Sequence, residues 1–249
     1  MYFSHTKVSS VVVVILVLLL FFKSVIKTTF IIATLPITWH IRSSDFYISE
    51  TRDNFDLSFS NYSIDQQSSL PEYEDQVPAI LHHIVLGGDI KEGWIQARNN
   101  CLQHHHDWET YLWTSENATQ FVEEKFPLLK DMWHRYKYPI QRVDALRYML
   151  LYEYGGMILS SSPLDAADKK KGAVLDMDLD CRRSLGPLRR FAFTAPAAHP
   201  VGFSNGFMMA ARRHPFVGQL IRHLRKYDRN WFGLPYATVM FSTGCHYAS

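Results

Sequence analysis

The chain has 249 residues, of which 47% are hydrophobic and 20% are charged, and its formal net charge at pH 7 is +2. This length suits one domain, or one domain with an appendage, and the composition excludes global disorder. The near balance of charge excludes a dedicated nucleic-acid-binding protein, which would carry a strong basic excess. The aromatic fraction of 14% is typical both of hydrophobic cores and of clefts for sugars or lipids.

The chain has three cysteines, Cys101, Cys181 and Cys245, which are widely spaced. This spacing excludes a disulfide framework and a zinc ribbon. One disulfide can form in an oxidising compartment, and it would leave one thiol free.

An almost uninterrupted apolar run, VSSVVVVILVLLLFF, occupies residues 8–22 and resumes after Lys23. It is apolar on all sides, which favours lipid over a packed core helix, although it is shorter than the ~20 residues that span a bilayer unaided. We expect a cytosolic tail and a transmembrane signal anchor over residues 1–40. A cleaved signal peptide is the alternative, and lysines on both sides leave the orientation undecided.

Residues 41–77 are rich in Ser, Asp, Gln and Asn, which predicts a stem or linker. From residue 78 to residue 249, apolar stretches of strand type alternate with stretches of helix type. This alternation predicts an α/β domain with a mostly parallel sheet. The expected strands are residues 79–86, 110–113, 191–194 and 207–209, and the expected helices are residues 94–103, 119–125, 128–136, 140–154 and 216–227.

Several chemistries lack their usual motifs, because the sequence contains no GxGxxG, GxxxxGK[ST], GxSxG or CxxC. The run His104-His105-His106 is expected to be a solvated surface run, since consecutive residues on a helix do not face one another. His82 and His83, which lie in an apolar strand, are expected to be core histidines.

The strongest predicted helix, residues 140–154, begins after Pro139 and ends at Gly155-Gly156. Its apolar residues, spaced by three and four, predict one core-facing stripe. Asp144 and Arg147 are three residues apart and therefore share a face offset from that stripe. They form either an ordinary surface ion pair or a site that holds a polyhydroxylated, phosphate-bearing ligand.

The segment Leu175-Asp176-Met177-Asp178 places two carboxylates on one face of an extended chain. Two such carboxylates repel one another unless a cation lies between them, and hard divalent ions such as Mn²⁺ or Mg²⁺ prefer oxygen ligands. A divalent ion at this position suits nucleotide-sugar transfer, because it neutralises the departing diphosphate. A DxD triplet alone is a weak signal, and the preceding QRxDxxRY helix and glycine pair strengthen it.

The sequence PIQRVDALRYMLLYEYGG followed by LDMDLDCRR resembles the DXD-containing glycosyltransferases with a GT-A fold. It is most similar to the family of outer-chain mannosyltransferases and mannosyl-inositol-phosphoceramide synthases, and within it to the inositol-phosphoceramide branch. The resemblance covers about residue 78 to the C-terminus. It implies that Asp176 and Asp178 bind the metal and the nucleotide sugar, and that Asp144 and Arg147 contact the nucleotide sugar.

The implied reaction is transfer of mannose from GDP-mannose to inositol-phosphoceramide with Mn²⁺ or Mg²⁺, in the lumen of the Golgi. The implied partners are the donor, the lipid acceptor, the membrane and a regulatory membrane subunit, with no nucleic acid. The resemblance implies retention of anomeric configuration, and the sequence assigns no nucleophile or base. Transfer to glycoprotein glycans and a catalytically impaired chain are the alternatives.

Two departures from the family pattern support the impaired alternative. Residues 158–173, ILSSSPLDAADKKKGA, separate the glycine pair from the DXD strand, which the family keeps continuous. A retained intron or gene-model error and a genuine surface insertion both remain open, and we expect this segment to loop out from the strand edge. The family also continues further than Ser249, where this chain ends after a strand-like segment, so we expect a truncated catalytic domain.

Overall fold

The computed structural model describes residues 5–87, 92–160, 179–198, 201–231 and 233–249. It separates into two compact units, Met1–Phe55 and Asp56–Ser249. The first unit contains α1 (His5–Arg42), η1 (Ser43–Asp45) and α2 (Glu50–Asp53).

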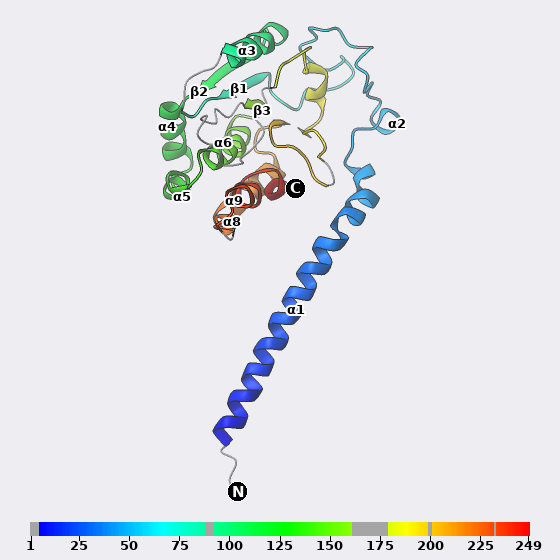
Figure 1. Cartoon of the computed structure of the whole chain (residues 1–249). Coiled ribbons are helices and arrows are strands. Elements are labelled where there is room, and N and C mark those ends of the chain that lie inside the picture. The colour runs from blue at the N-terminus through cyan, green and yellow to red at the C-terminus, as the bar shows by residue number, and fades with distance from the viewer. Residues whose placement is uncertain (1–4, 88–91, 161–178, 199–200, 232) are drawn as a thin grey trace. The chain divides into compact units, whose positions relative to one another are not determined.

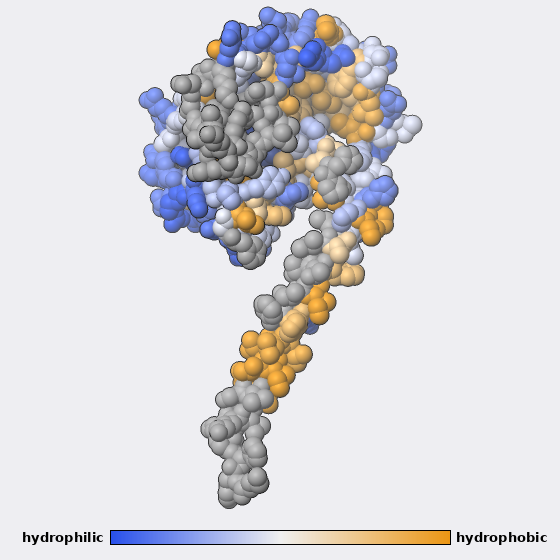
Figure 2. Space-filling model, in the orientation of Figure 1, coloured by the Kyte–Doolittle hydropathy of each residue, from blue (hydrophilic) through white to orange (hydrophobic). Residues whose placement is uncertain are grey.

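Helix α1 exposes large apolar side chains over much of its described length, as Figure 2 shows, and Val12 to Leu20 are each about half exposed or more. Among the residues that the structure describes, no helix is both long enough and apolar enough to cross a membrane. The signal anchor over residues 1–40 stays a prediction.

Over its described residues, the second unit is a mixed α/β fold built on a five-stranded sheet in the order β2-β1-β3-β5-β4 (Figure 1). Strand β1 pairs in parallel with both β2 and β3, whereas β5 is antiparallel to β3 and to β4. The expected α/β class is confirmed, and the parallel arrangement holds for β2-β1-β3 but not for the pairs of β5. The strands are β1 (Ile80–Ile84), β2 (Glu109–Trp113), β3 (Gly156–Ser160), β4 (Phe193–Thr194) and β5 (Phe207–Ala210).

The helices of this unit follow the predicted order as far as α8, and the segment that was expected to be strand-like at the C-terminus is helical instead. Its two helices, α9 and α10, each begin next to a helix-starting signal, Pro235 at the first position of α9 and Gly244 before α10. The helices are α3 (Glu92–His104), α4 (Ser115–Lys125), α5 (Lys130–Arg135), α6 (Pro139–Glu153), η2 (Gly186–Arg190), α8 (Pro215–Tyr227), α9 (Pro235–Ser242) and α10 (Cys245–Ala248).

Helix α6 forms the centre of the globular unit. Pro139 occupies its first turn as predicted. Every residue from Val143 to Leu151 is buried, because α4, α5, α8, α9 and the sheet all contact this helix. The helix is therefore buried on more sides than the single core-facing stripe that the spacing predicts.

The predicted glycine pair ends α6 and turns the chain into β3. Gly155 and Gly156 have positive φ angles of 72° and 95°, which side chains disfavour. A Cβ atom on Gly156 would lie 2.5 Å from the carbonyl oxygen of Ile80, so this turn also lets β3 approach β1 closely.

The structure corrects the prediction for the start of the segment 158–173. Ile158, Leu159 and Ser160 form the second half of β3, where Ile158 pairs with His82 on one side and Met208 on the other. Two consecutive buried apolar residues suit a central strand that is covered on both faces. The prediction that the segment loops out is therefore wrong for residues 158–160, and residues 161–173 lie outside the described residues.

The structure places the start of the globular unit at Asp56, before the boundary that the sequence predicts at residue 78. Arg189 donates hydrogen bonds to the carbonyl oxygens of Val77 and Gln67, and it pairs with Asp75 at 2.7 Å. The side chains of this stretch resemble those of a linker. Several of its contacts with the rest of the globular unit are made by backbone carbonyl oxygens, which leave no signal in the sequence.

Candidate functional site

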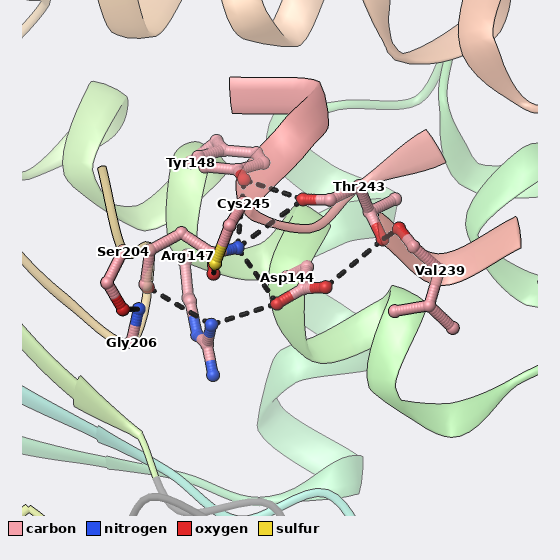
Figure 3. A network of polar contacts seen from close by, with 9 residues as sticks. Asp144, Arg147, Tyr148, Ser204, Gly206, Val239, Thr243 and Cys245 are labelled. Carbon is pink, nitrogen blue, oxygen red and sulfur yellow. Dashed lines mark hydrogen bonds and ion pairs between the residues drawn. The ribbon is translucent and has the colours of Figure 1, made fainter. Parts of the chain in front are cut away.

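Asp144 and Arg147 lie one turn apart on α6 and contact each other (Figure 3). Nη1 of Arg147 donates to Oδ1 of Asp144 at 2.8 Å, and the two side chains are 6% and 3% exposed. The prediction that they share a face is confirmed. The alternative of an ordinary surface ion pair is wrong, because both groups are buried.

Asn205, which precedes β5, holds this pair in place. Its side-chain Nδ2 donates to Oδ1 of Asp144 at 3.1 Å and to the hydroxyl of Tyr148 at 3.0 Å. Its backbone carbonyl accepts from Nη1 of Arg147 at 3.0 Å. The guanidinium of Arg147 is thereby fixed from two directions.

The C-terminal segment completes the network around Asp144. The hydroxyl of Thr243 donates to Oδ2 of Asp144 at 3.2 Å, and the hydroxyl of Tyr148 donates to the carbonyl oxygen of Thr243 at 2.6 Å. The thiol of Cys245 donates to Oδ1 of Asn205 at 3.0 Å. Both oxygens of the Asp144 carboxylate therefore accept hydrogen bonds from elements that are far from α6 in sequence.

Burial governs the protonation of these groups. Loss of water raises the pKa of Asp144 to about 6, although Arg147, Thr243 and Asn205 act in the opposite direction. Burial also raises the pKa of Tyr148 well above its usual value. At pH 7 the carboxylate is therefore mostly ionised and pairs with Arg147.

Sequence reasoning did not identify Asn205, Thr243 or Cys245 as members of this network. They lie about 60 to 100 residues from Asp144 along the chain, and no local motif relates them to it. Only the packing of α9 and β5 against α6 brings them together.

The predicted metal residues Asp176 and Asp178 lie outside the described residues. Among the residues that the structure describes, no group of three or more His, Cys, Asp or Glu side chains could hold a metal ion. Asp180, next in the acidic series, has its own partners, because Oδ1 accepts from Nδ2 of Asn100 at 2.8 Å and Oδ2 pairs with Arg182.

A disulfide between Cys101 and Cys181 fixes the chain just after the DXD motif. It joins α3 to a residue three positions beyond Asp178. Cys245 is the free thiol. The sequence allowed one bridge with one thiol left over and did not decide whether the bridge forms, and the structure contains it.

One histidine of the run 104–106 is not exposed to solvent, whereas the sequence predicted exposure for all three. His105 is fully buried beside this disulfide, where its Nδ1 donates to the carbonyl oxygen of Cys101 at 2.7 Å and its Nε2 accepts from the amide of Leu185 at 3.0 Å. Burial lowers its pKa, which favours the neutral ring that this pattern requires. His105 therefore helps to hold the segment 181–185 next to α3, as the disulfide does. His82 and His83 are buried in β1 as predicted.

Removing the disulfide is expected to destabilise the globular unit. Its cysteines are 80 residues apart, and bridges that close loops of this kind typically stabilise proteins by about 2–4 kcal/mol. The double variant Cys101→Ser/Cys181→Ser should therefore unfold at lower denaturant concentration than the wild type under oxidising conditions.

The matched control is Cys245→Ser, which keeps a hydrogen-bond donor next to Asn205 and should leave the midpoint nearly unchanged. Reductant should lower the midpoint of the wild type and of this control but not that of the double variant. Equal midpoints for the oxidised wild type and the double variant would show that the bridge does not form in solution.

Comparison with known proteins relates part of the chain to glycosyltransferases. Residues 91–159, which include Asp144 and Arg147 and stop before Asp176, match the family model "Glycosyltransferase sugar-binding region containing DXD motif". Over 180 residues the chain is 37% identical to mannosyl phosphorylinositol ceramide synthase SUR1 of Saccharomyces cerevisiae, covering 72% of this chain and 43% of that protein. Over 194 residues it is 32% identical to inositol phosphoceramide mannosyltransferase 1 of Schizosaccharomyces pombe, covering 76% of this chain and 55% of that protein.

Among solved structures, the chain is similar to PaToxG Glycosyltransferase with a TM-score of 0.46 and 14% sequence identity, over 77% of this chain and 73% of that chain. That TM-score is too low to establish a shared fold. The chain spans about half the length of the curated relatives it matches. The resemblance to the inositol phosphoceramide mannosyltransferases is confirmed, and residues 91–159 are similar to the sugar-binding region of the DXD-containing glycosyltransferases.

Proposed function

We propose that the chain is a metal-dependent mannosyltransferase with a GT-A-like domain, which transfers mannose from GDP-mannose to inositol-phosphoceramide. The observation that carries this proposal is the similarity to several curated mannosyltransferases that are named for this lipid acceptor, at 32–37% identity. The DXD motif and the buried Asp144–Arg147 pair supply the groups that a sugar-nucleotide transferase requires.

Asp176 and Asp178 fit a metal by the chemistry of their side chains, because two carboxylates on one face of an extended chain offer the oxygen ligands that Mn²⁺ and Mg²⁺ prefer. Such an ion, when bound, supplies neutralisation of the charge on the departing nucleoside diphosphate.

In this proposal Arg147 adds a cationic contact to the donor, and Asp144 contacts the sugar nucleotide or orients Arg147. The second role of Asp144 has direct support, because both of its oxygens bind groups of the protein. A fixed guanidinium suits diphosphate binding, since its geometry is set before the ligand arrives. No side chain is assigned as nucleophile or base.

The alternatives are a mannosyltransferase that acts on glycoprotein glycans and a catalytically impaired chain. One observation favours impairment. Residues 158–160 occupy the strand positions that follow the glycine pair and Met157, and these positions belong to the DXD strand in the family that the sequence resembles.

We further propose that the enzyme is attached to the Golgi membrane with its globular unit in the lumen, where a regulatory membrane subunit can bind it. The disulfide supports a lumenal location, because such bridges persist in oxidising compartments. The apolar side chains of α1 support attachment to a membrane. Protection of the globular unit from protease in sealed Golgi vesicles tests the orientation.

The acceptor is tested by offering the purified chain labelled GDP-mannose together with inositol-phosphoceramide and a mannose-ended glycopeptide. We expect label in the lipid fraction alone, and its loss when a chelator is added. Label in the glycopeptide would replace the lipid acceptor with the glycan alternative, and label in neither fraction would favour the impaired chain.

A further inference from the structure

An exposed surface with aromatic and basic side chains lies at the junction of α8 and α9. This aromatic–basic surface consists of residues 225–231 and 233–236 together with Phe241. Tyr227, Leu234, Tyr236 and Phe241 are 37%, 58%, 53% and 41% exposed. They are half of the eight large exposed hydrophobic residues of the described globular unit, so apolar exposure is concentrated here rather than scattered as on most protein surfaces.

The charges of the surface are mainly positive. Arg225, Lys226 and Arg229 are exposed, and Asp228 is the one acidic residue between them. The side chain of Arg225 donates to the carbonyl oxygen of Leu128. Leu128 is 76% exposed, so the apolar area continues onto the neighbouring loop that contains it.

The surface is joined to the candidate site by packed rings and by α9. The ring of Tyr227 contacts that of Tyr247, which in turn contacts Tyr148 of the buried network. At the other end of α9, Ser242 accepts from Gln141 at 2.7 Å and Thr243 donates to Asp144. One short helix therefore separates the exposed rings from the groups that surround Arg147.

We propose that the aromatic–basic surface docks the globular unit onto a lipid bilayer that carries anionic headgroups. In the lumenal orientation proposed above, the phosphodiester of inositol-phosphoceramide supplies the negative charge. Tyrosine and tryptophan rings with a polar tip favour the interface between lipid and water. Lysine and arginine near the surface bind anionic lipids, each contributing to the attraction. The purpose of the docking, which is access to a lipid acceptor, rests on the proposed function.

The test uses the full chain, reconstituted in vesicles of phosphatidylcholine alone or of phosphatidylcholine with phosphatidylserine, and in neutral detergent micelles. Backbone amide exchange is followed by mass spectrometry. We expect amides of residues 225–241 to exchange several-fold more slowly on the phosphatidylserine vesicles than in micelles, with less protection on phosphatidylcholine alone.

The variant Leu234→Asp/Tyr236→Asp should lose this protection. The matched control is Leu57→Asp/Ile64→Asp, which changes two side chains of the same unit that are 52% and 56% exposed, and it should keep the protection. Equal exchange on all three preparations, or protection that the first variant retains, overturns docking. Protection that rises with protein concentration in micelles overturns it in favour of a second copy of the chain.

Mannose transfer to inositol-phosphoceramide in micelles, where no bilayer exists, separates the two proposals. We expect the Leu234→Asp/Tyr236→Asp variant to keep this activity. If the wild type transfers no mannose in micelles, the proposed function fails, and the exchange measurement still decides whether the surface binds a bilayer.

Discussion

Mannose transfer is expected to fall by roughly 10³-fold or more when Asp176 and Asp178 are both replaced by Asn. The amides keep the size of the side chains but lose the charge that holds a divalent cation. A metal ion contributes several kcal/mol of charge stabilisation at the departing phosphate, and each ~1.4 kcal/mol corresponds to a factor of ten in rate. The measurement is the initial rate of labelled mannose transfer at saturating Mn²⁺.

The matched control is Asp180→Asn, which removes the same charge two residues further along the chain. Because Asp180 binds Asn100 and Arg182, we expect this variant to keep most of the activity. Unchanged transfer by the double variant would refute the metal assignment, and an equal loss in Asp180→Asn would show that the effect is not specific to the motif.

Replacing Asp144 by Ala is expected to lower the free energy of unfolding by about 3–5 kcal/mol, because it leaves the guanidinium of Arg147 buried without its carboxylate. Thr243 and Asn205 also lose an acceptor. The measurement is denaturant unfolding at pH 7. The control is Asp131→Ala, an exposed aspartate on α5, which should change the stability little.

The free energy of unfolding of the wild type and of Asp144→Ala, measured as a function of pH, tests the protonation of Asp144. Its pKa of about 6 exceeds the usual value near 4, so the native state binds the proton more tightly than the unfolded state does. The stability that this provides is present below about pH 4 and is lost as the pH rises through 6. The wild type should show this fall and Asp144→Ala should not, and parallel pH curves for both chains would contradict the described burial.

Local patterns in the sequence predicted much of the fold. The helix over residues 140–154 follows from Pro139, from apolar spacing and from Gly155-Gly156, all of which act within a few residues. Asp144 and Arg147 could be placed on one face for the same reason, because helix geometry fixes residues three apart.

Features that depend on distant residues could not be predicted in this way. The burial of Asp144 results from Asn205 and Thr243, which reach it only through tertiary packing. His105 is fully buried and accepts a hydrogen bond from the amide of Leu185, which is 80 residues away, and a run of three histidines does not indicate this. The sequence did not indicate strand structure over residues 158–160, because polar residues follow Leu159 directly. In a central strand, two buried apolar residues are nevertheless enough to complete β3.

The central claim is that this chain transfers mannose from GDP-mannose to inositol-phosphoceramide through its DXD motif. It is tested most directly by comparing the wild type with a variant that lacks residues 158–173. In the variant, Val174 and Leu175 would replace Ile158 and Leu159 in β3, and Asp176 would take the position of Ser160 at the end of the strand. We predict that both chains fold and that the variant binds Mn²⁺ more tightly and transfers mannose to the lipid faster than the wild type. A folded variant that transfers no mannose with Mn²⁺ present, or one that binds Mn²⁺ more weakly than the wild type, would contradict the account.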